Sequence, residues 1–473
     1  MMSTVLAPRY ETSPSSVSAD VLARFDVAGP RYTSYPTADR FVEAFGPDDY
    51  GAAARQRRLG ISAVMTPISL YVHIPFCASL CYYCACNKII TRHASRAREY
   101  LRYLEKEIAL HAAQLGARTQ VSQLHLGGGT PTFLSDDGLS DLMRMLRDAF
   151  SFAPGGEYSI EIDPRTVDAD RLAHLARLGF NRLSFGVQDF DPDVQQAVHR
   201  IQSAQQVFDL VASARELKFQ SINVDLIYGL PRQSAVSFDR TLAQICALRP
   251  DRIALYAYAH LPERFKPQRR IATDELPYAA TKLEMLSRSI AALTSVGYVY
   301  IGMDHFALPD DSLAVAKRQG RLHRNFQGYS TQPDCDLVAF GVSAIGRVGG
   351  TYSQNAKTLE DYYDHLDQGR LPVVRGLALS RDDVLRRAVI MAIMCQGHVD
   401  FESIDIAHLI TFRDYFASEL AALGQLEADG LVCLTDRDLT VTDKGWFFVR
   451  AVAMVFDRYL QTDRKRARFS RII

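Results

Sequence analysis

The chain has no excess of charge of either sign. Its 473 residues contain 54 Lys and Arg against 54 Asp and Glu, so the formal net charge is zero. Such a chain has no overall field to attract nucleic acid or an anionic membrane surface, and we expect neither as a partner. An anionic ligand would therefore have to be bound by local arginines.

Long apolar runs are also missing, although 48% of the residues are hydrophobic and suffice for a large core. No stretch approaches the roughly 18 apolar residues of a membrane span. The longest candidate, residues 388–395, predicts a buried helix instead. The first twenty residues are polar and Ser-rich, without the charged-then-apolar pattern of a secretion signal. We therefore expect a cytoplasmic protein, in the reducing environment that an oxygen-sensitive cofactor needs.

Cysteine is scarce outside one segment. Four of the 8 cysteines stand alone in the sequence, and we expect them to be ordinary thiols: Cys246, Cys335, Cys395 and Cys433. The other four lie within ten residues of one another: Cys77, Cys81, Cys84 and Cys86.

This concentration argues against three common uses of cysteine. Structural zinc usually takes two separated cysteine pairs, and no second pair exists here. A ferredoxin-type cluster needs four thiolates at C-x2-C-x2-C spacing, whereas these residues follow C-x3-C-x2-C. A disulfide framework is not expected in a chain of this length without a secretion signal.

The spacing of Cys77, Cys81 and Cys84 predicts a [4Fe–4S] cluster held by three thiolates. Such a cluster leaves one iron without a protein ligand, and an open iron can bind and activate another molecule. We interpret the segment as a catalytic iron–sulfur site that cleaves S-adenosylmethionine (SAM) to a radical. Cys86 could also ligate, but a fourth thiolate would close the site, so we expect it to be a nearby thiol that does not bind iron.

Residues 70–260 alternate short apolar segments with amphipathic stretches. The expected strands are residues 70–75, 123–126, 158–162, 182–187, 222–227 and 253–258. Strands that alternate with helices of this kind indicate βαβ units and a parallel sheet. Six units are too few for a closed eight-unit barrel. We predict an α/β fold with an open partial (β/α)6 TIM-like barrel at residues 61–370, an N-terminal extension at 1–60 and a mainly helical C-terminal domain at 371–473.

Glycine or polar residues follow each expected strand. Ligands of parallel α/β folds bind at the C-terminal ends of the strands, so we expect these residues to share a site, although each alone would more simply be a helix cap or turn. They are the cysteine loop, Gly127–Gly129, Glu161 and Asp163, Gln188, Asp225, and Tyr258 with His260. The glycine run lacks the dinucleotide and P-loop patterns, and we expect its backbone to cradle the methionine end of SAM.

The C-terminal region reads as helices followed by a hairpin, like a winged-helix module. The expected helices are residues 381–394 and 412–423, and the expected strands are 431–434 and 439–442. The sequence does not favour DNA binding, because the candidate recognition helix carries only Arg413 for phosphates. The basic run at residues 464–468 is either solvated or contacts an acidic electron donor or substrate carboxylates.

With these motifs, the sequence resembles the oxygen-independent coproporphyrinogen III dehydrogenases (oxidases), radical-SAM enzymes of heme synthesis. The most specific motif is Cys-x3-Cys-x2-Cys-Ala-Cys-Asn-Lys at residues 77–88, whose ending separates this family from related heme chaperones. Further family segments are residues 29–37 (Gly-Pro-Arg-Tyr-Thr-Ser-Tyr-Pro-Thr), 124–132, 223–231 and 341–345. The resemblance covers nearly the whole chain.

The resemblance implies that Cys77, Cys81 and Cys84 bind the cluster while Cys86 does not, and that Tyr71 is also catalytic. It implies two SAM molecules in one site. The family's SAM-binding positions fall on Tyr71, Tyr83, Gly128, Gly129, Thr130, Glu161, Gln188, Arg200, Asp225, Ala259 and Ile345.

The resemblance also implies a reaction. One electron from the reduced cluster cleaves SAM, and the 5′-deoxyadenosyl radical takes a hydrogen from the β-carbon of a propionate of coproporphyrinogen III. Loss of carbon dioxide and one electron leaves a vinyl group, and two such conversions give protoporphyrinogen IX. The cofactors supply this chemistry, and the protein positions the substrate. A monomeric enzyme and a low-potential electron donor, such as flavodoxin or ferredoxin, are expected.

The four carboxylates of that substrate require local cations, for which guanidinium is well suited. The candidates are Arg31, Arg165, Arg200 and Arg347. We expect residues 29–37 to help close the substrate pocket, with Tyr32 and Tyr35 packing on the macrocycle or on the barrel. The alternatives are a heme-binding chaperone or a heme-modifying radical-SAM enzyme of the same superfamily, and a non-catalytic DNA-binding regulator.

Overall fold

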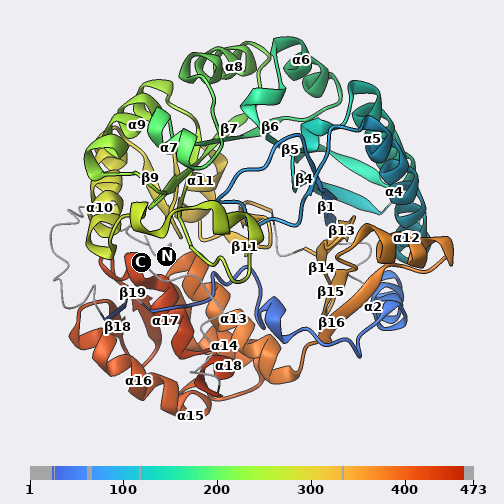
Figure 1. The fold of residues 1–473 in the computed structure, drawn as a ribbon. Coiled ribbons are helices and arrows are strands. Elements are labelled where there is room, and N and C mark those ends of the chain that lie inside the picture. The colour runs from blue at the N-terminus through green and yellow to red at the C-terminus, as the bar shows by residue number, and fades with distance from the viewer. Residues whose placement is uncertain (1–23, 26, 61–65, 117–118, 333–334, 463–473) are drawn as a thin grey trace. The chain divides into compact units, whose positions relative to one another are not determined.

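The computed structural model describes residues 24–25, 27–60, 66–116, 119–332 and 335–462 (Figure 1). The chain forms two compact units. The sheet unit comprises the described parts of residues 38–281 and 334–379, and the helical unit comprises those of residues 1–37, 282–333 and 380–473. The basic run predicted at 464–468 and the polar first twenty residues lie outside the described residues. The division into an extension, a barrel and a C-terminal domain stays a prediction.

The sheet unit is built on parallel strands, and the predicted α/β partial barrel is confirmed (Figure 1). Each of the following strands is parallel to the next: β1 (Ile68–Ile74), β4 (Gln120–Gly128), β5 (Ser151–Ile162), β6 (Arg182–Gln188), β7 (Ser221–Tyr228) and β8 (Arg252–Ala257). On the other side of β1, β13 (Leu337–Phe340) is parallel, and β14 (Ile345–Val348), β15 (Thr351–Asn355) and β16 (Val373–Ala378) continue the sheet in antiparallel order. All six predicted strands are present, so their C-terminal ends meet at one edge.

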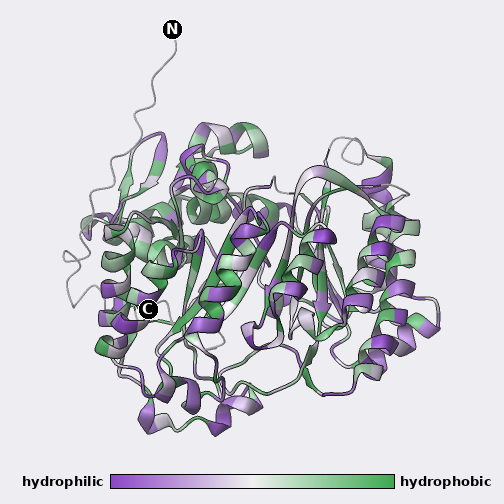
Figure 2. Cartoon of the chain, turned by 90° about the horizontal axis from the view of Figure 1, so that it is seen from above, coloured by the Kyte–Doolittle hydropathy of each residue, from purple (hydrophilic) through white to green (hydrophobic). Residues whose placement is uncertain are grey.

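Helices connect the parallel strands and cover the sheet (Figure 1). They are α4 (Ala94–Leu115), α5 (Asp136–Ala149), α6 (Ala169–Arg177), α7 (Pro192–Ala197), α8 (Ala204–Glu216) and α9 (Ala235–Leu248). Ser135 caps α5 by accepting a hydrogen bond from a main-chain amide of its first turn. Leu139, Leu142 and Leu146 then bury one face of this helix. In Figure 2 such helices alternate between hydrophobic and hydrophilic colouring, as expected of elements with one face on a core.

The remaining elements of the sheet unit are short or peripheral. They are η2 (Ala38–Arg40), α2 (Pro47–Leu59), β2 (Phe76–Cys77), β3 (Ile89–Ile90), η3 (Pro131–Phe133), η4 (Pro164–Thr166), η5 (Lys266–Arg270), η6 (Thr273–Glu275) and α12 (Leu359–Asp367). The first residues of α10 (Ala279–Ser295) also belong to this unit, and the rest of α10 belongs to the helical unit.

The helical unit surrounds a core to which α13 (Arg381–Gln396) contributes Val389, Ile390 and Ile393. Its other helices are α11 (Ser312–Arg318), α14 (Phe401–His408), α15 (Phe412–Tyr415), α16 (Ala417–Ala428), η7 (Gly445–Phe448), α17 (Val449–Val455) and α18 (Arg458–Thr462). Its strands are β9 (Val299–Gly302), β10 (His305–Ala307), β11 (His323–Asn325), β12 (Gly328–Ser330), β17 (His398–Asp400), β18 (Val432–Leu434) and β19 (Asp438–Val441). Across the described ranges, no helix combines the length and apolar character needed to cross a bilayer.

The structure confirms the predicted C-terminal hairpin as β18 and β19, with β17 as a third strand. The single helix predicted at residues 412–423 is wrong, because α15 and α16 are separate helices that meet at Phe416. Phe416 is fully buried and packs against Phe412 and Phe456 at ring-centroid distances of 4.7 and 5.4 Å. Tertiary packing of these rings therefore overrides the local helical pattern.

Tyr32 and Tyr35 are core residues of the helical unit, with 1% and 0% of their surface exposed. The Tyr32 hydroxyl donates to Asp457 Oδ2 at 3.0 Å, and the Tyr35 hydroxyl accepts from the Arg458 amide at 3.3 Å. The structure shows neither of the two alternatives expected for these rings, packing on a macrocycle or on the barrel, since both are enclosed in the core of the helical unit.

The buried carboxylate of Glu107, in α4, links several elements of the sheet unit through hydrogen bonds. Its side chain is 0% exposed. It accepts hydrogen bonds from the Gly341 amide at 2.7 Å, from Asn355 Nδ2 at 2.6 Å and from the Tyr362 hydroxyl at 2.5 Å. Glu107 thereby holds the turn that leads from β13 into β14.

We predict that Glu107→Leu lowers the free energy of unfolding by about 3 kcal/mol or more, because the substitution leaves buried donors without an acceptor. Urea denaturation of the full chain measures the change. Glu105→Leu on the exposed face of the same helix is the matched control, with an expected effect within about 0.5 kcal/mol. Equal effects of the two substitutions would contradict the role of the network.

Candidate active site

The cysteine loop leaves the end of β1 and is anchored by main-chain hydrogen bonds from β4. The Gly129 amide donates to the Ile74 carbonyl at 2.8 Å, and the Thr130 amide donates to the Phe76 carbonyl at 2.9 Å. These bonds extend the pairing of β1 and β4 beyond the sheet.

The far end of the loop returns to the same backbone. The Ile89 amide donates to the Pro75 carbonyl at 2.7 Å, and the Thr91 amide donates to the Cys77 carbonyl at 3.0 Å. The segment that holds the cysteines is therefore closed by the short parallel pairing of β2 with β3.

The glycine run is required by contacts within the protein. A Cβ on Gly129 would lie 2.8 Å from the Phe76 carbonyl oxygen, and a Cβ on Gly128 would lie 2.6 Å from the His73 ring. Gly128 also has a φ of +112°, which side-chain-bearing residues rarely adopt. The expected cradle for SAM stays a prediction, and close approach to β1 is the reason for glycine that the structure provides.

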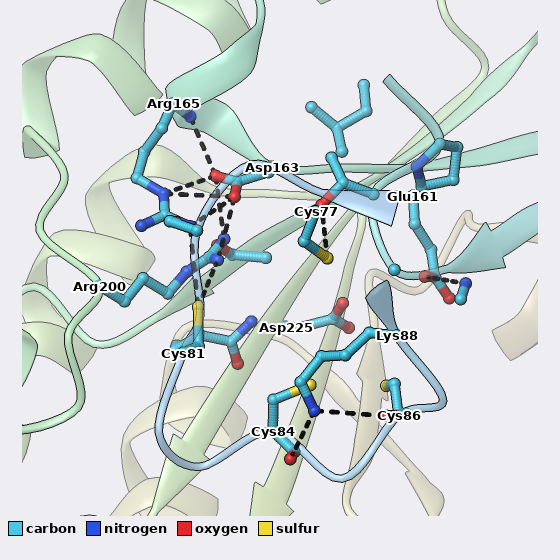
Figure 3. A pocket seen from close by; sticks show the side chains of 18 of the residues that line it. Cys77, Cys81, Cys84, Cys86, Lys88, Glu161, Asp163, Arg165, Arg200 and Asp225 are labelled. Carbon is cyan, nitrogen blue, oxygen red and sulfur yellow. Dashed lines mark hydrogen bonds and ion pairs between the residues drawn. The ribbon is translucent and has the colours of Figure 1, made fainter. Parts of the chain in front are cut away.

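A cavity of about 170 Å³ lies beneath the loop, at the C-terminal edge of the strands (Figure 3). It is lined by most of the predicted site residues: Cys77, Cys81, Cys84, Tyr83, Gly128, Gly129, Thr130, Glu161, Gln188, Arg200 and Asp225. The predicted residues Tyr71, Ala259 and Ile345 do not line it. Tyr71 lies within β1, Ala259 follows β8, and Ile345 begins β14.

The cysteines of the loop have unequal thiol acidities. A hydrogen bond from the Cys86 thiol and the nearby Lys88 ammonium lower the pKa of Cys84 to about 6. Burial raises the pKa of Cys77 to about 11, although the Thr130 hydroxyl donates to its sulfur at 3.4 Å. The Cys84 thiol therefore loses its proton more readily than the Cys77 thiol.

Lys88 fixes the shape of the loop. Its ammonium donates to the carbonyls of Cys84 at 3.1 Å and of Cys86 at 3.3 Å (Figure 3). Within the described part of the chain, no three potential ligands converge on one point as they would around a single ion. The donor set suits a [4Fe–4S] cluster, because each thiolate of such a cluster binds a different iron.

Two carboxylates face the cavity from β5 and β7. Glu161 accepts from the Gly128 amide and from His125 Nε2, both at 3.2 Å. Asp225 accepts from the Ser184 hydroxyl at 3.1 Å. Burial, together with the charge of Glu161, raises the pKa of Asp225 to about 6.

Tyr71 is joined to the cysteine loop through His73. Burial lowers the pKa of His73, so its ring is neutral at physiological pH. His73 Nε2 lies 2.9 Å from the Asn87 carbonyl and must carry the proton, so Nδ1 accepts from the Tyr71 hydroxyl at 3.0 Å. This chain connects the β1 strand to the Asn-Lys ending of the motif.

Gln188 ends β6 in a conformation that is unusual for its residue type. Its φ is +68°, and the pairing of β6 with β7 shifts register between Gly186 and Gln188. Such left-handed residues cluster at binding sites, where surrounding contacts hold them.

The arginines expected to bind substrate lie in different surroundings. Arg165 and Arg200 both contact Asp163 and the Cys81 sulfur (Figure 3). Arg31 pairs with Asp304 at 3.2 Å in the helical unit, and Arg347 donates to the Cys335 carbonyl at 3.0 Å.

Several polar residues of the site were missed by the sequence reasoning. Lys88 stands inside the motif, but its spacing alone does not reveal its two carbonyl partners. Ser184 and Asn223 lie two residues before Gly186 and Asp225, on the same faces of β6 and β7. The alternation of side chains along a strand, which places every second residue on the same face, could have identified them.

Comparison with known proteins agrees with this geometry. Residues 71–245 match the Radical SAM superfamily model, and residues 379–448 match the HemN C-terminal domain model. The oxygen-independent coproporphyrinogen III oxidase of Pseudomonas aeruginosa is 50% identical over 96% of this chain and 98% of its own length. The enzyme of the same name from Escherichia coli is 49% identical over 96% and 98%.

A solved structure is also similar over most of the chain. The coproporphyrinogen III oxidase (HemN) of Escherichia coli, described as a radical SAM enzyme, superposes with a TM-score of 0.87 at 49% identity. The match covers 91% of this chain and 98% of that one. With three cysteines on one loop above the strand ends, and with such relatives along nearly its full length, the chain belongs to the oxygen-independent coproporphyrinogen III oxidase family of radical SAM enzymes.

Proposed function

We propose that this chain catalyses the oxygen-independent conversion of coproporphyrinogen III to protoporphyrinogen IX, in porphyrin and heme synthesis. One observation carries the proposal: the three motif cysteines line the same strand-end cavity as Glu161 and Asp225. A regulator without enzymatic activity would have no need of this arrangement. The heme-chaperone and heme-modifying alternatives are not favoured by the names of the similar proteins.

The cofactors of the proposed reaction are a [4Fe–4S] cluster and two SAM molecules. Cys77, Cys81 and Cys84 would hold the cluster, and Cys86 would not bind iron. When bound, the cluster and SAM supply one-electron chemistry that generates a carbon radical. A low-potential donor, such as flavodoxin or ferredoxin, would provide the electron to a monomeric enzyme in the cytoplasm.

The protein's own residues would bind and orient SAM. SAM carries an ammonium, a carboxylate and a sulfonium, so it suits a cavity lined by both acidic and basic groups. The proposed contacts are Tyr71, Tyr83, Gly128, Gly129, Thr130, Glu161, Gln188, Arg200, Asp225, Ala259 and Ile345. The ordered hydrogen bonds of Glu161 and Asp225 support their role, because carboxylates held in place bind cationic groups without further loss of side-chain freedom.

Residues 29–37 would contribute to the substrate pocket through Arg31. Its guanidinium is partly exposed and pairs with Asp304 at 3.2 Å, and its planar fork is of the kind that binds carboxylates. Tyr32 and Tyr35 would anchor this segment from within the core.

An anaerobic assay tests the proposed reaction. Reconstituted protein with SAM, dithionite and coproporphyrinogen III should yield protoporphyrinogen IX and 5′-deoxyadenosine. Cys81→Ser should lose both products, whereas Cys246→Ser, a thiol of α9 away from the cavity, should keep them. Release of 5′-deoxyadenosine without a vinyl product would rule out the proposed substrate, and tight heme binding without turnover would favour the chaperone.

The pKa of Asp225 predicts a pH dependence of SAM binding. Because this pKa is about 6, the carboxylate is charged at pH 7.5 and loses its charge as the pH falls below 6. We expect the dissociation constant for SAM, measured by equilibrium dialysis, to rise about fourfold between pH 7.5 and 5.5, the equivalent of about 0.8 kcal/mol. Asp225→Asn should bind weakly at both pH values. A pH profile unchanged by this substitution, at equal cluster content, would contradict the assignment.

Arg31→Gln tests the substrate role of the N-terminal segment. Loss of one carboxylate contact should raise KM for coproporphyrinogen III about tenfold, or about 1.4 kcal/mol, with little change in kcat. Deletion of the segment is a poorer test, because it also removes Tyr32 and Tyr35 from the core. Arg318→Gln, at an exposed position of α11, is the control. An unchanged KM would show that Arg31 does not meet the substrate.

A further inference from the structure

The Cys81 sulfur receives hydrogen bonds from two guanidinium groups. Arg200 Nη1 lies 3.5 Å from Cys81 Sγ, and Arg165 Nη2 lies 3.7 Å from it (Figure 3). The other two motif cysteines have different hydrogen-bond partners. Cys77 Sγ accepts from the neutral Thr130 hydroxyl, and Lys88 bonds the carbonyl of Cys84. The Lys88 ammonium also lowers the pKa of the Cys84 thiol, so what distinguishes Cys81 among the three is that two guanidinium groups donate to its sulfur.

Asp163 holds both guanidiniums in place. Arg165 donates to its two carboxylate oxygens through Nε at 2.9 Å and Nη2 at 2.6 Å. Arg200 reaches the same carboxylate at 3.3 Å through each of its Nη atoms. The three side chains are between 8% and 20% exposed. Two positive charges and one negative charge leave a net charge of +1 beside Cys81, with little water to screen it.

Nε and Nη2 of Arg165 and both Nη atoms of Arg200 are engaged within the protein, whereas the buried Nε of Arg200 has no hydrogen-bond partner among the described residues. Arg200 Nη2 also donates to the Gly186 carbonyl at 2.5 Å. Binding a substrate carboxylate would require the arginines to give up part of this arrangement, so the structure favours a role toward the sulfur over the substrate role expected of Arg165 from the sequence.

Hydrogen bonds to ligand sulfurs and the local net charge are two factors that set the reduction potential of an iron–sulfur cluster. Reduction adds one electron from an external low-potential donor and makes the cluster more negative, while the guanidiniums keep their protons. A positive group that donates to a ligand sulfur therefore stabilises the reduced form and raises the potential. A carboxylate beside that group has the opposite effect.

We infer that Arg165 is a positioning residue that acts through Cys81 to raise the reduction potential of the cluster, and that Asp163 limits this effect. The inference rests on the proposed [4Fe–4S] site. It assigns opposite electrostatic effects to two residues that contact each other, which a purely structural ion pair would not produce.

Redox titration of the reconstituted full-length protein, followed by electron paramagnetic resonance without SAM or substrate, tests the inference. Arg165→Met should lower the potential and Asp163→Asn should raise it. Each change should alter the reduction equilibrium constant about tenfold, which is about 59 mV for a one-electron couple. Arg165→Lys, which keeps the charge but loses the fork, should fall between the wild type and Arg165→Met.

Matched controls separate this effect from loss of structure. Arg182 and Glu157 form another buried pair, at 2.9 Å, at the start of β6 and away from the cysteines. Arg182→Met should leave the potential unchanged. If Arg165→Met does not retain a cluster, the opposed shifts of Arg165→Lys and Asp163→Asn decide the question.

Shifts of the same sign for the Arg165 and Asp163 substitutions, or no shift at equal cluster content, would overturn the inference while leaving the proposed function intact. A wild-type protein that assembles no [4Fe–4S] cluster would instead overturn the proposed function, and the inference with it.

Discussion

The close approach of the end of β4 to the end of β1 is the constraint on which the site depends. Gly129 and Thr130 donate main-chain hydrogen bonds to the segment that enters the cysteine loop, and no Cβ fits at Gly129. β3 closes the loop from its other end, and the Tyr82 amide donates to the Val198 carbonyl at 2.9 Å, so the thiols are held at the strand edge. The strand ends opposite the loop thus remain available for SAM.

Although the chain as a whole is neutral, charged side chains are concentrated around the cavity. Two guanidiniums and one carboxylate surround Cys81, while Glu161 and Asp225 place acidic groups at other points of the cavity (Figure 3). A ligand with groups of both signs is suited to such a separation of charge. The low dielectric of a buried site strengthens charge–charge interactions, so a few charged side chains suffice to attract a charged ligand.

The sequence predicted the strands of the sheet unit well, because buried parallel strands carry apolar β-branched residues over short runs. It was less successful where packing between distant residues decides the structure. The helix predicted at 412–423 is interrupted at Phe416, whose ring packs against Phe456. The tyrosines of the N-terminal segment were expected on the macrocycle or on the barrel, yet both are enclosed in the helical unit. The local sequence around an aromatic residue does not reveal which distant side chains will enclose its ring.

The sequence by itself determined that the motif cysteines share one loop, because their spacing leaves only a few residues between one thiol and the next, and this is the basis of the proposed ligand set. It also determined which polar residues follow the strands, since the ends of parallel strands share one edge. Only the tertiary structure decided what those residues touch. Arg165 and Arg200 meet Cys81 across 84 and 119 residues of chain, and the Asp163 carboxylate between them selects that position. Contacts over such separations depend on how strands and loops pack, and no local pattern of residues encodes them.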